Sequence, residues 1–465
     1  MSLPADPGSY RDREGRVFHR DGRVLRTLSA AALAEWEALQ ATRFFPRAMA
    51  AGRVVATRRV ELPADAPPAR ARPWVAALEH ERVPFLSYPY EWSFGMLRDA
   101  AKLQLGLLSE ALEEGFVLKD SSAYNFQWLG ARPLLIDVPS FERLAPGEPW
   151  VGYLQFCQLF LYPLLLTAYR DVPFQPLLRG ALDGVTPETA AALLHGRDRL
   201  RRGVFTHVWL QARLQALAAG AERSVKRQLA ESGFSRALIL ANVRKLARLV
   251  DALAWRRTAS TWAGYRESHG YSAEDHAAKR EFVARAAAGR KPGLVWDLGA
   301  NTGDFARVCR DHAGYVVALD ADHLAVERLY QELRRDGETR ILPLVGNVVD
   351  PSTGLGWRGR ERQGLEDRGR PDLVLALALI HHLVIGANVP LDELVDWWAS
   401  LGGDLVVEFV AREDPMVKKL LLNKEDRYAD YDRDRLERAL GRHWALERRL
   451  DLASGTRTLY HARRA

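Results

Sequence analysis

The chain has 465 residues, of which 48% are hydrophobic and 27% charged, a composition that indicates a folded globular protein and excludes a disordered or fibrous one. Its length predicts two or three domains and excludes a small scaffold held together by disulfides. The net charge of +7 would suit a nucleic-acid or anionic partner, but the arginines are scattered along the whole chain. We interpret this charge as a solvated surface and expect no nucleic-acid partner.

The cysteines and the apolar segments predict a cytoplasmic protein. Cys157 and Cys309 lie far apart in the sequence and cannot form a disulfide framework or a structural zinc site. Residues 1–16 contain no apolar segment that would mark the chain for secretion. Residues 151–169 are the most apolar stretch, but two glutamines and a proline interrupt it. We therefore expect a buried helix there and no membrane span.

Short strands and helices are predicted in the N-terminal part. Residues 15–28 form two apolar runs around Asp21-Gly22, a pair of residues typical of a β-hairpin turn. Ser29 precedes an alanine-rich run and is suited to cap a helix there. Further along the chain we expect a strand pair near 52–62, a Pro/Ala-rich loop over 63–73, a helix over 94–114 and a largely helical region over 150–285.

Three polar residues follow the predicted helix 94–114. Asp120 lies five residues before Asn125, and Asp137 ends the next predicted strand. This spacing resembles the catalytic loop and metal-binding strand of protein-kinase-like phosphotransferases. The resemblance implies that Asp120 receives a hydroxyl proton, that Asn125 and Asp137 hold magnesium, and that ATP is bound. It predicts an α+β kinase-like or substrate-recognition domain over residues 1–210.

The same region also departs from the kinase pattern. No glycine-rich loop precedes the first strands, Arg26 stands where a strand lysine is expected, and Val138-Pro139 follows the metal-binding position. We therefore favour acceptor recognition as the role of this domain. The alternatives are an active phosphotransferase, or that Asp120 and Asn125 simply form turns, as these residue types often do.

The chain changes character near residue 291. From there, apolar runs typical of buried strands alternate with helical segments, the pattern of a doubly wound parallel sheet with a Rossmann-like α/β fold. We predict that residues 291–465 form this domain. A helical linker and a cofactor lid are expected over residues 211–290.

A glycine turn follows the first of these strands. Asp297 ends the strand, Gly299 and Gly303 lie in the turn, and Asp320 ends the second strand. Glycine allows a sharp turn and close approach of a ligand to the backbone, and ligands of such sheets bind beyond the carboxyl ends of the strands. The spacing differs from the G-x-G-x-x-G pattern of dinucleotide sites, which disfavours NAD. A carboxylate such as that of Asp320 can accept hydrogen bonds from both ribose hydroxyls.

These residues and spacings resemble those of class I S-adenosylmethionine-dependent methyltransferases. Residues 258–462 further resemble a bacterial subgroup related to nodulation-associated, NoeA-like methyltransferases, through the segments ILPLVGNVVDP, DLVLALALIHHLVIGANVPL and VVEFVAREDPMVKKLL. The resemblance implies that Asn347 faces the adenine of the cofactor. The residues expected to bind S-adenosylmethionine around the turn are Asp297, Gly299, Asn301, Thr302, Gly303 and Asp320.

The methyl acceptor is expected near the fourth strand. By the resemblance, His381 and His382 lie where this superfamily places groups that touch the acceptor. A neutral imidazole can remove the proton of an acceptor hydroxyl as the new bond forms. Glu408, at the end of the fifth strand, is a second candidate for a base or an acceptor-binding carboxylate. The alternative is that one or both histidines, and Glu408, only support the fold.

An aromatic segment precedes the first strand of the sheet. Tyr265, Tyr271 and Lys279 recur there, where related methyltransferases carry a lid over the cofactor. Aromatic rings could cover the sulfonium, and the lysine could bind the methionine carboxylate. An ordinary amphipathic helix packed on the sheet would explain the same residues.

Together these features predict a cytoplasmic methyltransferase that uses S-adenosylmethionine. We expect O-methylation of a hydroxyl on a sugar, a glycolipid or a secondary metabolite, so the expected partner is a small-molecule or glycan acceptor. The tetrapeptide of amino-directed DNA methyltransferases is absent after the fourth strand, which disfavours methylation of bases. The alternatives are a bifunctional kinase-methyltransferase and a non-catalytic scaffold that binds S-adenosylmethionine.

Overall fold

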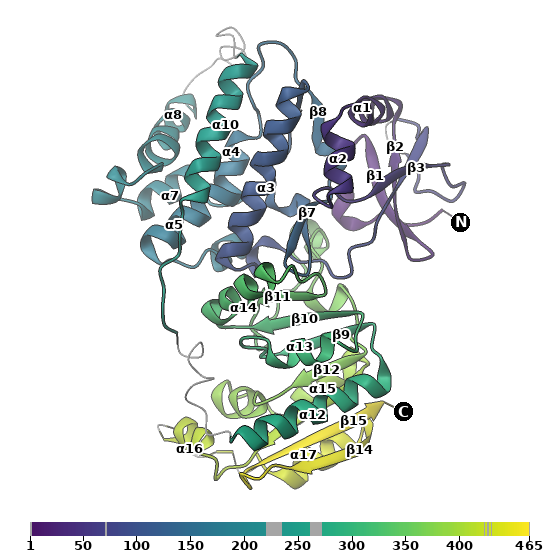
Figure 1. The fold of residues 1–465 in the computed structure, drawn as a ribbon, viewed down its shortest axis with the longest axis vertical. Helices are drawn as coiled ribbons and strands as arrows, with labels where there is room; N and C mark the ends of the chain where they lie inside the picture. The colour runs from purple at the N-terminus through teal and green to yellow at the C-terminus, as the bar shows by residue number, and fades with distance from the viewer. Residues whose placement is uncertain are drawn as a thin grey trace. The chain divides into compact units, whose positions relative to one another are not determined.

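The computed structural model divides the chain into two compact units (Figure 1). Unit 1 comprises Met1–Trp128, Pro133–Arg257 and Gly354–Arg362, and unit 2 comprises Leu129–Arg132, Thr258–Thr353 and Gln363–Ala465. This division differs from the three parts predicted above, because most of the expected linker belongs to unit 1. The structure describes residues 2–69, 72–219, 235–260, 272–422, 424–425, 427–428 and 430–464.

Unit 1 contains a four-stranded antiparallel sheet in the order β1-β2-β4-β3. The predicted hairpin is present, and both turn residues have positive φ, +49° at Asp21 and +76° at Gly22, as a two-residue hairpin turn requires. Near 52–62 only β3 forms, and its partner is β4, beyond the Pro/Ala-rich loop. The strands of unit 1 are β1 (Gly15–Arg20), β2 (Arg23–Leu28), β3 (Thr57–Val60), β4 (Ala76–His80), β5 (Phe116–Leu118), β6 (Phe126–Leu129), β7 (Arg132–Leu135) and β8 (Phe141–Arg143), of which β6 and β7 each have one residue in unit 2.

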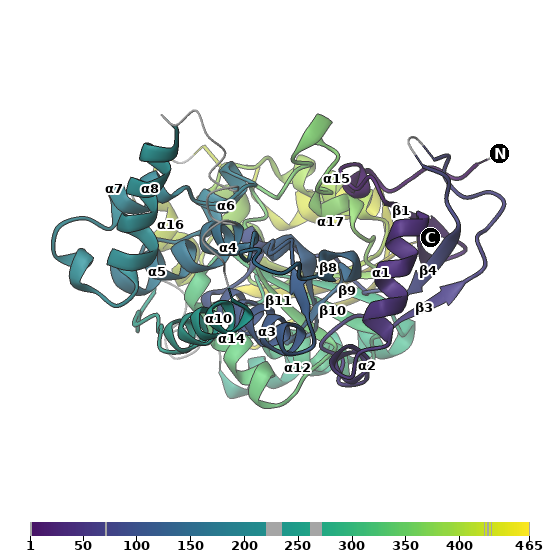
Figure 2. The ribbon, with the colours of Figure 1, turned by 90° about the horizontal axis from the view of Figure 1, so that it is seen from above.

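The helices of unit 1 follow the predicted apolar periodicity. Ser29 Oγ accepts the Ala32 N–H, which confirms the predicted cap of α1. The predicted helix 94–114 is α3, in which thirteen of the twenty residues are buried. Helix α10 packs beside α3 (Figure 2), which places this part of the expected linker in unit 1. The bounds are α1 (Ala30–Gln40), α2 (Phe44–Ala50), α3 (Phe94–Glu113), α4 (Tyr153–Phe156), α5 (Tyr162–Arg170), α6 (Gln175–Gly180), α7 (Pro187–Leu193), α8 (Leu210–Ala219) and α10 (Arg236–Asp251).

Unit 2 is built on a seven-stranded sheet in the order β11-β10-β9-β12-β13-β15-β14. The first five strands are parallel, as predicted, so this part has the expected Rossmann-like α/β fold. The last two strands are antiparallel and were not predicted, because half of the residues of β14 are charged and most of them are exposed. The strands are β9 (Leu294–Leu298), β10 (Tyr315–Asp320), β11 (Ile341–Val345), β12 (Leu373–Ala376), β13 (Asp404–Val410), β14 (Trp444–Asp451) and β15 (Arg457–Arg464).

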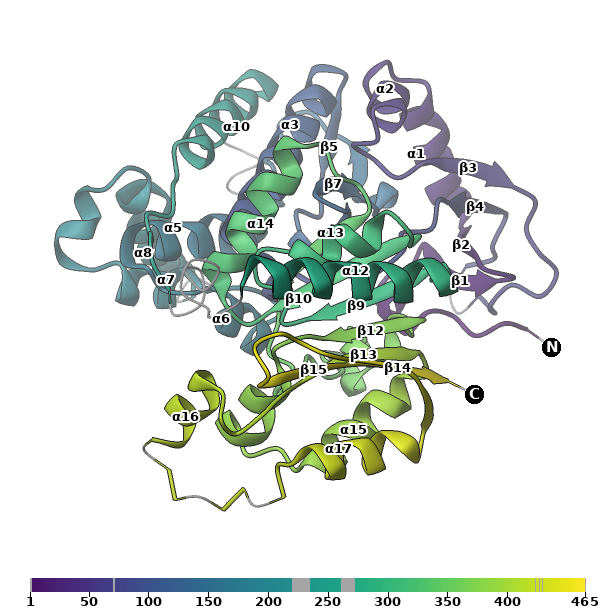
Figure 3. The same ribbon diagram turned by 60° about the horizontal axis from the view of Figure 1, so that its bottom comes forward.

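Helices cover both faces of this sheet. Figure 3 shows α12, α13 and α14 over one face and α15 and α17 over the other. The strand order reverses between β9 and β12, and this switch point is where parallel α/β sheets bind their ligands. The helices are α12 (Ala273–Arg290), α13 (Asp304–Arg310), α14 (His323–Arg335), α15 (Leu391–Leu401), α16 (Pro415–Leu421) and α17 (Arg433–Gly441).

The described helices also bear on the expectation about membranes. None of the helices in the described ranges is long and apolar enough to cross a bilayer. The apolar stretch 151–169 instead forms α4, a π-helical segment over Cys157–Leu161 and α5, which are largely buried.

Candidate functional site

The glycine turn lies at the switch point of the unit 2 sheet. Gly299 has a φ of +74° and Gly303 a φ of +78°, a conformation that favours glycine. A Cβ atom at Gly303 would lie 2.6 Å from Leu329 Cδ1, so a side chain at this position would displace Leu329. The N–H groups of Gly299 and Ala300 donate to the carbonyl of Leu319, which fixes the turn to β10.

Asp320 binds the glycine turn from the neighbouring strand. Its Oδ2 accepts the Asn301 N–H at 2.7 Å, and its Oδ1 accepts the Asp322 N–H at 2.8 Å. Burial raises the pKa of Asp320, and these two hydrogen bonds oppose the rise. Each carboxylate oxygen has two acceptor sites. Asp320 can therefore hold the turn and still accept two ligand hydroxyls.

Asp297 is a buried carboxyl group with an unsatisfied oxygen. The residue is only 2% exposed, and its Oδ2 has no hydrogen-bond partner in the part of the chain that the structure describes. Burial, and then the charge of Asp320, raise the pKa of Asp297 to about 7. A buried polar atom without a partner is costly, so this oxygen indicates a place for a donor or a cation.

Lys279 forms a buried ion pair with Glu408. The Lys279 Nζ lies 2.7 Å from Glu408 Oε2, and both side chains are almost completely buried. Burial lowers the pKa of Lys279, while the charge of Glu408 opposes this shift. Arg457 Nη1 donates to the other Glu408 oxygen at 3.3 Å, and Arg457 Nε donates to Asp414 at 2.9 Å. Lys279 was expected to bind the methionine carboxylate of the cofactor. In the structure its ammonium group is paired with Glu408, a carboxylate of the protein itself.

Glu408 also holds the turn that follows β12. The Ala378 N–H donates to Glu408 Oε2 at 2.8 Å, and Ala378 has a φ of +50°, a strained conformation for a residue with a Cβ. Both Glu408 oxygens therefore accept hydrogen bonds. This geometry favours a positioning role for Glu408 over the predicted role of base, because a base needs a free oxygen facing the acceptor.

The two histidines of this turn lie together. The ring centroids of His381 and His382 are 4.0 Å apart, and a π-helical turn begins at His382, a feature frequent at functional sites. His381 is fully buried, and neither of its ring nitrogens has a hydrogen-bond partner within the described ranges. Burial lowers the pKa of both rings, that of His382 to about 4. Both imidazoles are therefore neutral near pH 7.

The other predicted cofactor residues are less informative. Asn347 is exposed after β11, where its side chain accepts the Val349 N–H at 3.0 Å and closes a turn. Thr302 is half-buried, and its carbonyl accepts a hydrogen bond from Arg307. Tyr265 and Tyr271 lie outside the described residues. The contacts that Asn347, Thr302 and the two tyrosines would make to a cofactor remain predictions.

Of the polar residues predicted in unit 1, Asp137 pairs with Arg26, whereas Asp120 and Asn125 form local hydrogen bonds. Arg26 donates to Asp137 Oδ1 at 2.7 Å and to Asp12 Oδ2 at 3.0 Å. Burial raises the pKa of Asp137, and the charge of Arg26 opposes the rise. Asp120 accepts the Ser122 N–H, which is a local turn, and the Asn125 amide reaches the carbonyl of Asp120. Arg26 thus supplies the positive charge that magnesium was expected to supply at Asp137.

No grouping of three or more His, Cys, Asp and Glu side chains suited to a metal ion occurs among the described residues. The magnesium role of Asn125 and Asp137 therefore stays a prediction.

Sequence reasoning missed Arg457 and Ala378, since Arg457 lies on an unpredicted strand and Ala378 is notable only for its backbone conformation.

Comparison with known proteins finds a relative that matches nearly the whole chain. No family model matches the chain. The nodulation protein NoeA of Rhizobium meliloti (strain 1021) is 34% identical over 465 residues, covering 97% of this chain and 94% of that protein. The N-methyltransferase NodS from Bradyrhizobium japonicum WM9, in complex with S-adenosyl-L-homocysteine, covers 44% of this chain and 93% of its own, at 12% identity and a TM-score of 0.32. The magnesium protoporphyrin IX methyltransferase ChlM from Synechocystis PCC 6803, with bound SAH, covers 43% and 92%, at 16% identity and a TM-score of 0.32.

Removing Lys279 alone should destabilise unit 2. Lys279→Met takes away one of the two cations beside the buried Glu408 carboxylate and leaves it with Arg457 alone, which we expect to cost about 1.5–3 kcal/mol of the free energy of unfolding. The double variant Lys279→Met/Glu408→Gln should recover part of this loss, because the buried carboxylate charge is removed as well. Urea unfolding followed by circular dichroism measures both, and Lys245→Met, at an exposed lysine of α10, is the control. Equal unfolding midpoints for Lys279→Met and the control would contradict the proposed pairing.

Proposed function

The chain belongs to the family of the nodulation protein NoeA, and on that premise we propose that it is an S-adenosylmethionine-dependent methyltransferase. The observation that carries the proposal is the pair of carboxyl groups, Asp297 and Asp320, on either side of the glycine turn at the switch point of the sheet. ATP and magnesium have no part in this proposal, since Arg26 already neutralises Asp137.

The residues present fit the cofactor. S-adenosylmethionine supplies, when bound, an electrophilic methyl group on a positively charged sulfonium. The unsatisfied Asp297 oxygen is suited to the positive charges of the methionine part, and Asp320 has acceptor sites left for the ribose hydroxyls. The turn around Gly299 and Gly303 leaves the backbone open to close approach. Asn301, Thr302 and Asn347 are proposed to complete the site.

The acceptor is proposed to be a hydroxyl on a sugar, a glycolipid or a secondary metabolite, bound beside His381 and His382. A hydroxyl must lose its proton as it takes up a methyl group, and a neutral imidazole nitrogen can accept that proton. Glu408 is proposed to act through the backbone, by holding Ala378 and hence the histidine turn in place. Acceptor recognition is the role proposed for unit 1.

The cofactor site can be tested by calorimetric titration. We expect S-adenosylmethionine to bind the natural chain with micromolar affinity, and Asp320→Ala to bind it about tenfold or more weakly, because the ribose loses a charged hydrogen-bond acceptor. Asp336→Ala, at an exposed aspartate that ends α14, is the control and should bind normally. Undetectable binding by the natural chain, or unchanged binding by Asp320→Ala, would refute the proposed site.

Ionisation of Asp297 should make cofactor binding depend on pH. Its raised pKa of about 7 means that the carboxyl is neutral below that pH and anionic above it, and only the anion attracts a sulfonium. Affinity for S-adenosylmethionine should therefore fall about threefold to tenfold per pH unit below pH 7. S-adenosylhomocysteine lacks the sulfonium charge and should show a smaller effect. Asp297→Asn should remove the difference between the two ligands; parallel pH profiles in the natural chain would rule this role out.

The histidine turn can be tested by transfer of labelled methyl groups to a panel of hydroxylated saccharides and metabolites. We expect His382→Ala to lower the turnover rate about 100-fold or more with little change in cofactor affinity, since a lost base typically costs this much. Because the pKa of His382 is about 4, turnover at saturating cofactor should persist well below pH 7. His312→Ala, at an exposed histidine, is the control. Equal turnover in the two variants would remove His382 from the reaction.

A further inference from the structure

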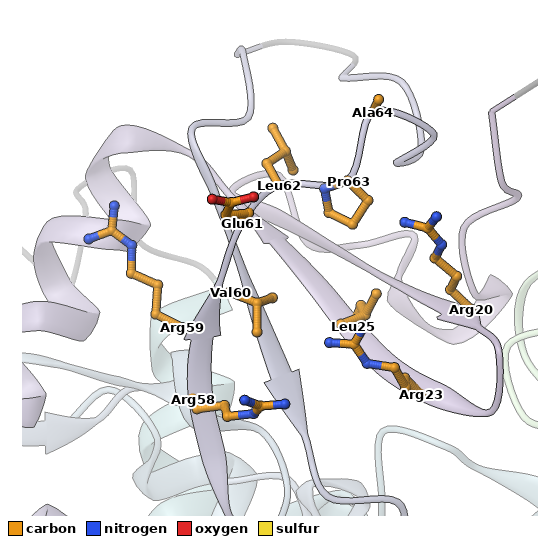
Figure 4. A pocket seen from close by; sticks show the side chains of 10 residues that line it. All are labelled: Arg20, Arg23, Leu25, Arg58, Arg59, Val60, Glu61, Leu62, Pro63 and Ala64. Carbon is orange, nitrogen blue, oxygen red and sulfur yellow. The ribbon is translucent and has the colours of Figure 1, made fainter.

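Unit 1 carries an arginine-lined hollow on its sheet, but its charges are already matched. The hollow has a volume of about 600 Å³ and is lined by Arg20, Arg23, Arg58 and Arg59 (Figure 4). Arg23 and Arg58 share Glu79 at 2.7 Å each, and Arg23 lowers the pKa of Glu79 to about 2. Arg20 pairs with Asp65 and Arg59 with Glu37. An incoming anion would have to displace these carboxylates.

A second basic surface lies on a tight hairpin over residues 354–362, which we call the Trp357 hairpin. Leu355 and Arg362 exchange two backbone hydrogen bonds of 3.0 Å. Gly356 has a φ of +74° and Gly359 a φ of +65°, and Arg358 has a φ of +60° although it carries a Cβ. Strain of this kind persists only where the surroundings enforce it, and it concentrates at functional sites.

A buried carboxylate anchors the hairpin within unit 1. Glu361 is only 7% exposed and accepts Arg11 Nε at 2.9 Å, Arg11 Nη2 at 3.1 Å and the Trp357 N–H at 3.1 Å. Tyr10 also donates its hydroxyl to Glu361, at 3.3 Å, and Arg362 lies over the ring of Tyr124. The hairpin is therefore held in one conformation before any ligand arrives.

The hairpin presents an aromatic ring and two unengaged cations. Trp357 is 64% exposed, and its ring stacks at 6.5 Å on that of Tyr10, so one face is supported and the other faces solvent. Arg358 and Arg360 are exposed, and neither forms an ion pair with any residue in the described ranges. This distinguishes them from the four arginines of the hollow.

We propose that the Trp357 hairpin binds a saccharide that carries an anionic group, a carboxylate or a sulfate. The face of an indole ring is electron-rich and attracts the polarised C–H bonds on the flat face of a sugar ring. An arginine side chain presents its N–H groups as a planar fork that matches the oxygens of an anionic group. The inference goes beyond the proposed methyl transfer, because this binding requires no cofactor.

The dimensions of the surface favour this ligand over a macromolecule. No other exposed large apolar side chain is present on residues 354–362, whereas a stable protein interface needs about 800 Å² on each partner. Two unengaged arginines are also few for nucleic acid, which is bound through a row of phosphate contacts. One ring face with two adjacent cations matches a single charged sugar unit.

Calorimetry with three trisaccharides tests the proposal on the full chain. The probes are trigalacturonate, maltotriose carrying sulfate esters, and neutral maltotriose. We expect both charged probes to bind, and maltotriose to bind at least about tenfold more weakly. Trp357→Ala should weaken the charged probes about tenfold, and Arg358→Ala/Arg360→Ala should abolish the preference for charge. Binding of only one charged probe would identify its anionic group as the one recognised.

Matched variants make the result specific. Phe205 is exposed to nearly the same extent, 63%, so Phe205→Ala should bind as the natural chain does. Arg236→Ala/Arg335→Ala removes two exposed charges elsewhere and should keep the preference. Equal binding by Trp357→Ala and Phe205→Ala, no binding of charged probes, or Trp357-dependent binding of anionic vesicles or RNA instead would overturn the proposal. Titration of Trp357→Ala with S-adenosylmethionine reports the cofactor site separately.

Discussion

The hydrogen bonds of one buried carboxylate organise the candidate site of unit 2. Glu408 is fully buried on β13 and accepts from Lys279 of α12, from Arg457 of β15 and from the backbone of Ala378. A buried charge is tolerated only where partners satisfy it. The four segments must therefore keep their positions together, and the strained turn after β12 is one of them. That turn carries the histidines, so their placement depends on a residue that touches no ligand in our proposal.

A second constraint comes from the two carboxyl groups at the ends of β9 and β10. Parallel pairing brings the ends of neighbouring strands together, and the charge of Asp320 contributes to the raised pKa of Asp297. Asp320 is satisfied by backbone N–H groups, whereas Asp297 keeps an oxygen without a partner. A buried polar oxygen without a partner is costly, and our proposal assigns the Asp297 oxygen to the positively charged part of the cofactor.

The elements that could be predicted from the sequence are those that depend on residues close to one another in the chain. The Asp21-Gly22 hairpin, the Ser29 cap, α3 and the parallel strands are encoded by neighbouring residues, and each is present as predicted. The pairing of β3 with β4 and of β14 with β15 depends on residues far away or on an edge that tolerates charge, so periodicity could not reveal it. The contacts of Lys279 were beyond sequence reasoning for the same reason, because its partner lies 129 residues along the chain. The Trp357 hairpin went unnoticed because its anchor is Glu361, whose partners are near the N-terminus.

The groups that the fold leaves unsatisfied differ in kind from those that it pairs. Lys279, Arg457, Glu408 and Asp414 are buried charges, and each has an opposite charge beside it. The Asp297 oxygen and the ring nitrogens of His381 are equally buried and have no partner among the described atoms. The Asp297 oxygen lacks a cation or a hydrogen-bond donor. The His381 nitrogens lack a polar group with which a neutral imidazole can share a proton. In our proposal these two groups serve the two halves of a methyl transfer, with the Asp297 oxygen beside the cationic methyl donor and the histidine turn beside the acceptor hydroxyl.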